Sequence, residues 1–182
     1  MTICIFPGTF NPIHEAHLKM AEFALQKYDF EKIIFIPSYL PPHKEIETNL
    51  AKHRYKMVEL AIKNNPKFEI SNIEYLSEGK SYSLITVKKI IEQYKLKNRL
   101  NFIIGTDAFG KIETWYKAEE LRDLVHFIVF PRKGYTIKNK DSWDYELTDM
   151  DFVDISSTEI RNGMKTNIKL ERYINEHGLY KI

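Results

Sequence analysis

The chain has 182 residues, of which 43% are hydrophobic and 29% are charged, the balance of an ordinary soluble globular domain. Its 27 basic and 25 acidic residues leave a net charge of +2, too small to favour a nucleic-acid-binding coat or a membrane surface. Neither a membrane-spanning stretch nor a signal peptide is expected, and the lone Cys4 fits a buried strand in a reducing compartment. We therefore expect one domain over 1–182, located in the cytoplasm, without nucleic-acid or membrane partners.

Strands and helices alternate along the chain. Short apolar runs predict buried strands over 2–6, 32–37, 68–71, 100–104 and 126–130, with a last strand over 151–155. Apolar residues at helical spacing predict helices over 14–28, 50–64, 83–94 and 118–124, and two short C-terminal helices near 158–164 and 170–177. The stretch 131–150 is expected to be irregular, either a lid or a surface excursion. This alternation predicts an α/β fold with a doubly wound, Rossmann-like parallel sheet and helices on both faces.

Ligands of such sheets bind beyond the carboxyl ends of the strands. The loops expected there are 7–14, 37–49, 105–116 and 131–135.

The first of these loops runs into a helix that opens at two histidines, in the segment Gly8-Thr9-Phe10-Asn11-Pro12-Ile13-His14-Glu15-Ala16-His17. A helix start has free N–H groups and a positive dipole end, which suit a phosphate. His14 and His17 are three residues apart and share one side of the first turn, so both can donate to phosphate oxygens. Zinc is disfavoured because the His-Glu-x-x-His pattern needs a four-residue spacing, and a bound NAD cofactor because G-x-G-x-x-G is absent. No metal ligand is predicted.

This segment resembles the GTFDPxHxGH signature of the nucleotidyltransferase superfamily. It differs by Ala16 in the place of a glycine, Asn11 for aspartate and Pro7 where a second glycine is usual. The resemblance implies nucleotidyl transfer, with ATP contacted by Gly8, Thr9, Phe10, His14 and His17.

Further segments resemble bacterial nicotinate mononucleotide adenylyltransferases in particular. They are Pro41-Pro42-His43-Lys44, Ser81-Tyr82-Ser83-Leu84-Ile85-Thr86, Ile104-Gly105-Thr106-Asp107 with Trp115-Tyr116, Phe130-Pro131-Arg132 and Ile155-Ser156-Ser157-Thr158-Glu159-Ile160-Arg161. The resemblance adds Gly105, Asp107, Arg132, Ser156, Ser157, Thr158 and Arg161 to the ATP site. It implies a mononucleotide site formed by Thr9, Lys44, Arg54, Ser83, Thr86, Trp115 and Tyr116.

The residues by themselves leave other interpretations open. Arg54 lies among apolar neighbours, so it is either paired, aimed at a phosphate, or stretched along the helix with its head in water. Trp115 offers a flat face to a pyridine ring or fills the core. Asp107 accepts from ribose hydroxyls or caps a helix, the serines of 81–83 fit a plain helix start, and Ser156 with Glu159 satisfies a capping box.

The implied reaction transfers AMP from ATP to nicotinate mononucleotide and gives deamido-NAD and pyrophosphate. The mononucleotide phosphate attacks in line, so catalysis is positioning and charge stabilisation by His17, His14, Lys44 and Arg161. Mg²⁺ is expected to arrive with ATP. Backbone amides near Ser83 and Tyr116 would hold the nicotinate carboxylate. The alternatives are phosphopantetheine adenylyltransferase and, given Pro7 and Ala16, a nucleotide-binding sensor without turnover. A homo-oligomer is compatible with the sequence.

Overall fold

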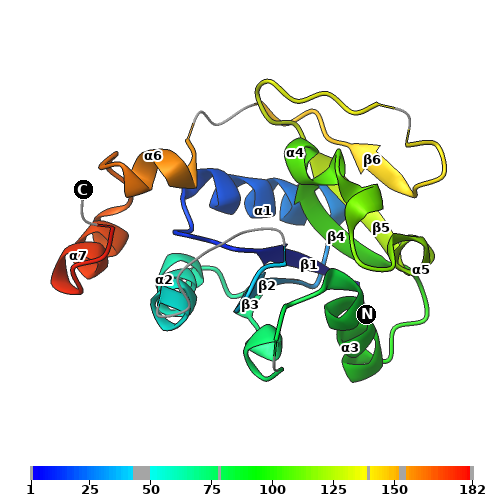
Figure 1. The fold of residues 1–182 in the computed structure, drawn as a ribbon, viewed down its shortest axis with the longest axis horizontal. Helices are drawn as coiled ribbons and strands as arrows, with labels where there is room; N and C mark the ends of the chain where they lie inside the picture. Colours follow the sequence, from blue (N-terminus) through cyan, green and yellow to red (C-terminus); the bar gives the residue numbers. More distant parts are fainter. Residues whose placement is uncertain (1, 43–49, 78, 139, 152–154, 181–182) are drawn as a thin grey trace.

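The computed structural model describes residues 2–42, 50–77, 79–138, 140–151 and 155–180. Six parallel strands form one sheet in the order β3-β2-β1-β4-β5-β6 (Figure 1). The strands are β1 (Ile3–Gly8), β2 (Lys32–Pro37), β3 (Phe68–Ile70), β4 (Leu100–Gly105), β5 (Val125–Phe130) and β6 (Tyr145–Leu147). The predicted doubly wound α/β class is confirmed.

Helices cover the sheet and extend beyond it at the C-terminal end of the chain (Figure 1). They are α1 (Glu15–Tyr28), α2 (Ala51–Ile62), α3 (Ser83–Tyr94), α4 (Thr106–Phe109), α5 (Ala118–Arg122), α6 (Ser157–Arg161) and α7 (Ile168–Glu176). Two one-turn 3₁₀ helices, η2 (Ile73–Tyr75) and η3 (Ile112–Thr114), lie in the connections.

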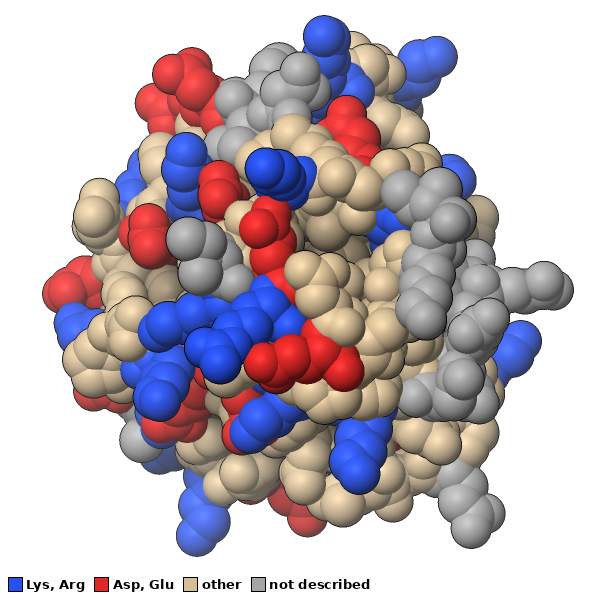
Figure 2. Space-filling model, turned by 90° about the vertical axis from the view of Figure 1, so that its left-hand side faces the viewer, with Lys and Arg blue, Asp and Glu red and all other residues tan. Residues whose placement is uncertain are grey.

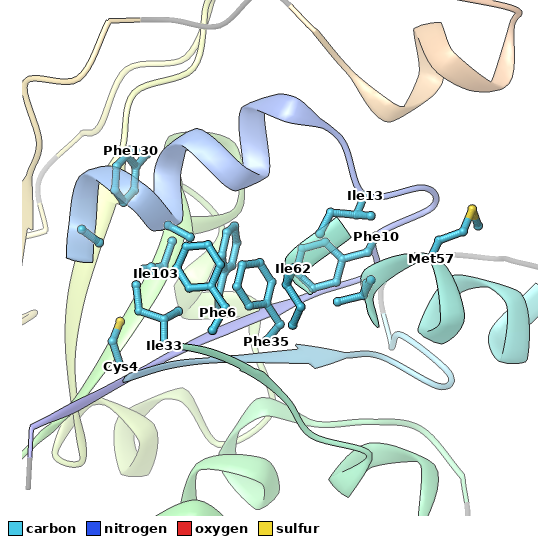
Figure 3. Close-up of a cluster of buried hydrophobic side chains, with 14 of the residues drawn as sticks. Cys4, Phe6, Phe10, Ile13, Ile33, Phe35, Met57, Ile62, Ile103 and Phe130 are labelled. Carbon is cyan, nitrogen blue, oxygen red and sulfur yellow. The ribbon is translucent and has the colours of Figure 1, made fainter. Parts of the chain in front are cut away.

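The strands bury side chains on both faces of the sheet, because successive residues of a strand point to opposite sides. In β1, Cys4 and Phe6 belong to a core cluster with Met57 and Ile62 of α2 (Figure 3). The same cluster includes residues of α1 and α7. Ile3 and Ile5 of the same strand belong to a second cluster with residues of α3, α4 and α5. Helices therefore lie on both faces, as predicted, and Cys4 is fully buried.

The sheet extends in opposite directions from its centre: β2 and β3 lie on one side of β1, and β4, β5 and β6 lie on the other. β1 pairs with β2 along its whole length, Ile3 to Gly8, whereas its pairs with β4 involve Cys4 and Ile5. The two central strands thus part before their carboxyl ends. In doubly wound sheets the ligand crevice opens at this switch point. The segments that leave it begin at Gly8, Gly105 and Phe130, and the last two are paired across β4 and β5.

The stretch 131–150, predicted to be irregular, contains one short strand that the sequence analysis did not predict. β6 lies there, at the edge of the sheet beside β5, where an irregular segment was expected. A three-residue edge strand that is not fully buried is too short to show an apolar run. The strand predicted over 151–155 falls on 152–154, which lie outside the described residues, and neither residue at its ends belongs to a strand.

Charges of both signs are interspersed on the surface. Figure 2 shows the face on the left of Figure 1, where Lys and Arg side chains lie beside Asp and Glu side chains. Among the described residues, no helix is both long and apolar enough to cross a membrane.

Candidate active site

The loop from β1 to α1 makes a tight turn around Phe10. A Cβ atom on Gly8 would lie 2.9 Å from Cζ of Phe10, so the turn has room only for glycine. Phe10 adopts a positive φ of 48° and its ring is buried in the core beside Phe6 and Phe35. The Phe10 side chain thus belongs to the core, and its predicted contact with ATP stays a prediction.

The two histidines are stacked at the start of α1, with ring centroids 3.8 Å apart. The His14 backbone N–H donates to Nδ1 of His17 at 3.1 Å. A neutral imidazole that accepts at Nδ1 has its proton on Nε2, so this hydrogen bond selects the tautomer in which Nε2 of His17 is a donor.

His14 is buried, and its Nδ1 atom has no hydrogen-bond partner. Burial, reinforced by the positive charge of Arg132, lowers the pKa of His14 to about 4. His14 is therefore neutral near pH 7 and offers a polar group to a ligand without adding a charge.

The start of α6 lies against this same loop (Figure 1). Ser157 Oγ donates to the Pro12 carbonyl at 2.8 Å, and the Arg161 guanidinium donates to the Asn11 carbonyl at 2.7 Å and to Thr158 Oγ1 at 3.0 Å. Ser157 and Pro12 are 145 residues apart in the chain. The structure thus brings together the two segments that were predicted to share a phosphate site.

Ser156 and Glu159 form the capping box that the sequence allows. Ser156 Oγ accepts from the Glu159 backbone N–H at 3.2 Å, and a Glu159 carboxylate oxygen accepts from the Ser156 N–H at 3.0 Å. Capping therefore accounts for Ser156 and Glu159. It does not account for Ser157 and Arg161, which contact the first loop, or for Thr158, which accepts from Arg161.

The carboxyl ends of β4 and β5 are joined by an ion pair. Arg132 donates through its guanidinium to Asp107 at 2.9 Å and through its backbone N–H to Thr106 Oγ1 at 2.9 Å. A Cβ atom on Gly105 would lie 2.7 Å from Asp107 Oδ1, so a larger residue at this position would clash with the carboxylate. Gly105, not Asp107, is the N-cap of α4, so the capping interpretation of Asp107 is wrong.

Arg54 is fully buried on α2. Its guanidinium donates to the carbonyls of Thr9 at 2.7 Å, Ser38 at 2.6 Å and Tyr39 at 3.1 Å. The interpretation that places its head in water is therefore wrong. Arg54 ties the loop after β1 to the loop after β2, and its direct contact with the mononucleotide stays a prediction.

Thr86 is also buried, in the first turn of α3. Its hydroxyl donates to Oε2 of Glu74 at 2.7 Å. The sequence analysis missed Glu74, because a carboxylate in the one-turn helix η2 carries no periodic or motif signal. The residue before α3, Tyr82, is its N-cap and makes no side-chain capping bond, so neither Ser81 nor Ser83 caps this helix.

Tyr82 and Tyr116 join the start of α3 to the segment that leaves η3. Their rings lie 4.5 Å apart at an angle of 33°, and Tyr116 is exposed. Trp115 is partly exposed and packs against the second core, with its ring 6.2 Å from that of Phe102. The backbone segments predicted to hold the nicotinate carboxylate are thus neighbours.

Lys44, and with it the segment 43–49, lies outside the described residues. In the part of the chain that the structure describes, no group of three His, Cys, Asp or Glu side chains is arranged to hold a metal ion.

A model of the cytidylyltransferase-like family matches residues 5–163 of this chain. The chain is 37% identical over 198 residues to a probable nicotinate-nucleotide adenylyltransferase of Caldicellulosiruptor saccharolyticus, covering 100% of both chains. It is 36% identical over 188 residues to nicotinate-nucleotide adenylyltransferase of Bacillus subtilis, covering 98% of each. Its fold is similar to that of Plasmodium falciparum nicotinic acid mononucleotide adenylyltransferase complexed with NaAD, with a TM-score of 0.81 over 98% of this chain and 96% of that one, at 22% identity.

Proposed function

The chain belongs to the cytidylyltransferase-like family, and we propose that it transfers AMP from ATP to nicotinate mononucleotide, giving nicotinate adenine dinucleotide (deamido-NAD) and pyrophosphate. It is a nicotinate-nucleotide adenylyltransferase of NAD biosynthesis, like the relatives that match it over their full length. One observation carries this function at the level of the site. The loop that leads into the two-histidine start of α1 is bound by Ser157 and Arg161 of α6, at the switch point of the sheet.

The first half of the site, called here the phosphate half, consists of His14, His17, Ser157, Thr158 and Arg161. The attacking phosphate is already an anion, so the reaction needs no general base and no protein nucleophile. Catalysis then depends on donors aimed at the phosphates. His17 supplies one through Nε2–H, and Arg161 supplies the positive charge that the leaving pyrophosphate requires. The Asp107–Arg132 pair flanks this half where the adenosine would lie.

The second half, called here the mononucleotide half, consists of Arg54, Glu74, Thr86, Trp115 and Tyr116 with the loops they support. Trp115 would contact the nicotinate ring, and the backbone amides near Ser83 and Tyr116 would hold its carboxylate. Backbone N–H donors favour a carboxylate over an amide, because they offer no acceptor for an amide N–H. Lys44 would contact the mononucleotide phosphate from the loop after β2.

Mg²⁺ would arrive bound to ATP, where it offsets the charge of the triphosphate. We also propose that the protein is located in the cytoplasm.

The test is a turnover assay with purified protein and Mg-ATP. We expect pyrophosphate release to depend on nicotinate mononucleotide and to be much slower with nicotinamide mononucleotide. Phosphopantetheine serves as the competing acceptor, and faster release with it would assign the enzyme to that substrate instead. ATP binding by calorimetry without any product would support a sensor.

A further inference from the structure

Glu74 is a buried carboxylate for which the proposed reaction has no use. It lies in η2, between β3 and α3, and only 6% of the residue is exposed. Oε2 accepts the Thr86 hydroxyl at 2.7 Å, while Oε1 is buried without a hydrogen-bond partner. Burying a carboxylate is costly unless it is fully hydrogen-bonded. A carboxylate kept at such a cost in the mononucleotide half calls for a role in that half.

The groups around Glu74 come from several elements. Ser38 follows β2, Ser81 precedes α3, and Lys89 lies on α3. Among the described residues, Arg54 of α2 and Tyr75 of η2 also interact electrostatically with it. Arg54 also donates to the Ser38 carbonyl, so Arg54 and Glu74 both lie next to the loop that follows β2.

The Thr86 hydroxyl has two acceptors within reach and one proton to give. Glu74 Oε2 lies at 2.7 Å and the Tyr82 carbonyl at 3.4 Å. When Glu74 is ionised, its Oε2 atom accepts the hydrogen bond from the Thr86 hydroxyl. A protonated Glu74 is itself a donor, so the Thr86 hydroxyl would accept from it and turn its own proton to Tyr82, the residue before Ser83.

We propose that Glu74 is a positioning residue for the mononucleotide, which holds the first turn of α3 through Thr86 so that the backbone near Ser83 can receive the carboxylate. This inference rests on the proposed function. Burial raises the pKa of Glu74 to about 7, against the opposing effects of the Thr86 hydrogen bond, the nearby Ser81 and Ser38 and the charge of Lys89, so its ionisation changes within the working pH range.

The experiment compares Glu74→Gln, Thr86→Val and Thr86→Ser with the wild-type enzyme. Glu74→Gln keeps the shape of the side chain but cannot ionise. Thr86→Val removes the hydroxyl, and Thr86→Ser keeps it. Glu92→Gln, an exposed carboxylate on the same helix, is the matched control. KM for each substrate, kcat and Tm are measured between pH 6 and 8.

At pH 8 we expect Glu74→Gln and Thr86→Val to raise KM for nicotinate mononucleotide about tenfold, the effect of one charge-assisted hydrogen bond. KM for ATP should change less than about twofold. Thr86→Ser should restore KM, and Glu92→Gln should leave it unchanged. The ratio of mutant to wild-type KM should fall toward one at pH 6, where wild-type Glu74 is itself protonated. The substrate phosphate titrates equally in both assays and cancels in this ratio.

Equal rises of both KM values with a lower Tm would show that Glu74 is merely structural and would overturn the proposal. A mutant-to-wild-type ratio that stays the same from pH 6 to 8 would also overturn it. These outcomes differ from failure of the proposed function, in which the wild-type enzyme itself releases no pyrophosphate with nicotinate mononucleotide.

Discussion

The two halves of the crevice are built on different principles. In the phosphate half, the polar side chains come from the start of α1 and from the short helix α6, and Ser157 and Arg161 donate to the backbone of the loop between β1 and α1. In the mononucleotide half, Arg54 and Glu74 are buried behind the loops they support. A triphosphate brings its own charge and needs donors that face it. A small ring with one carboxylate needs backbone amides in fixed places, and buried groups can fix them. The predictions below test this difference.

Replacing Arg54 by methionine should have the largest effect. The change leaves the carbonyls of Thr9, Ser38 and Tyr39 without their donor inside the protein, and we expect it to lower the free energy of unfolding by about 3–5 kcal/mol. Urea denaturation monitored by circular dichroism measures it. Arg172→Met, which removes an exposed pair with Glu176, should cost less than about 0.5 kcal/mol. Unchanged stability with a raised KM for the mononucleotide would instead make Arg54 a direct ligand.

His17→Ala tests the phosphate half. It removes a donor to the reacting phosphates, so kcat should fall about 10²–10³-fold, as when one oxyanion donor is lost. The side chain also accepts a backbone hydrogen bond at the start of α1 and packs beside Phe10, so some loss of Tm is expected as well. Steady-state kinetics and a thermal melt on the same preparation separate the two effects. Near-normal turnover would exclude His17 from the mechanism.

His14 should make the protein sensitive to acid. Its pKa is about 4 in the folded chain and 6.5 in the unfolded chain, so the unfolded chain binds the extra proton first. The free energy of unfolding is therefore not reduced by His14 above pH 6.5, where the group is neutral in both states. It falls as the pH decreases from 6.5 to about 4, because only the unfolded chain is protonated there. The loss amounts to about 3 kcal/mol. His14→Gln does not titrate, so wild type should lose this much more stability than the variant between pH 7 and 4. Equal losses in both proteins would show that His14 titrates normally.

The sequence predicted the parts of the molecule that leave local patterns. Buried strands appear as apolar runs, and the two histidines and Arg161 lie in motifs at helix starts. The buried network of the mononucleotide half leaves no such pattern. The carbonyls bound by Arg54 come from loops 45, 16 and 15 residues away, and nothing in the sequence distinguishes Glu74 from a surface glutamate. Such contacts depend on how the loops fold against α2 and α3, which periodicity and motif spacing do not encode.

Trp115→Ala should have the smallest effect. It distinguishes a Trp115 ring that contacts the nicotinate from one that only packs in the core. If the exposed part of Trp115 contacts the nicotinate ring, its loss removes a stacking interaction of about 0.5–1.5 kcal/mol. KM for nicotinate mononucleotide should then rise up to about tenfold, with KM for ATP nearly unchanged. Because Trp115 also packs beside Phe102, Tm will fall as well, so Trp115→Phe is the control. Phenylalanine keeps a flat ring and should recover most of the KM. An equal rise in both KM values, together with the lower Tm, would make Trp115 a core residue and leave ring recognition to the Tyr82–Tyr116 pair.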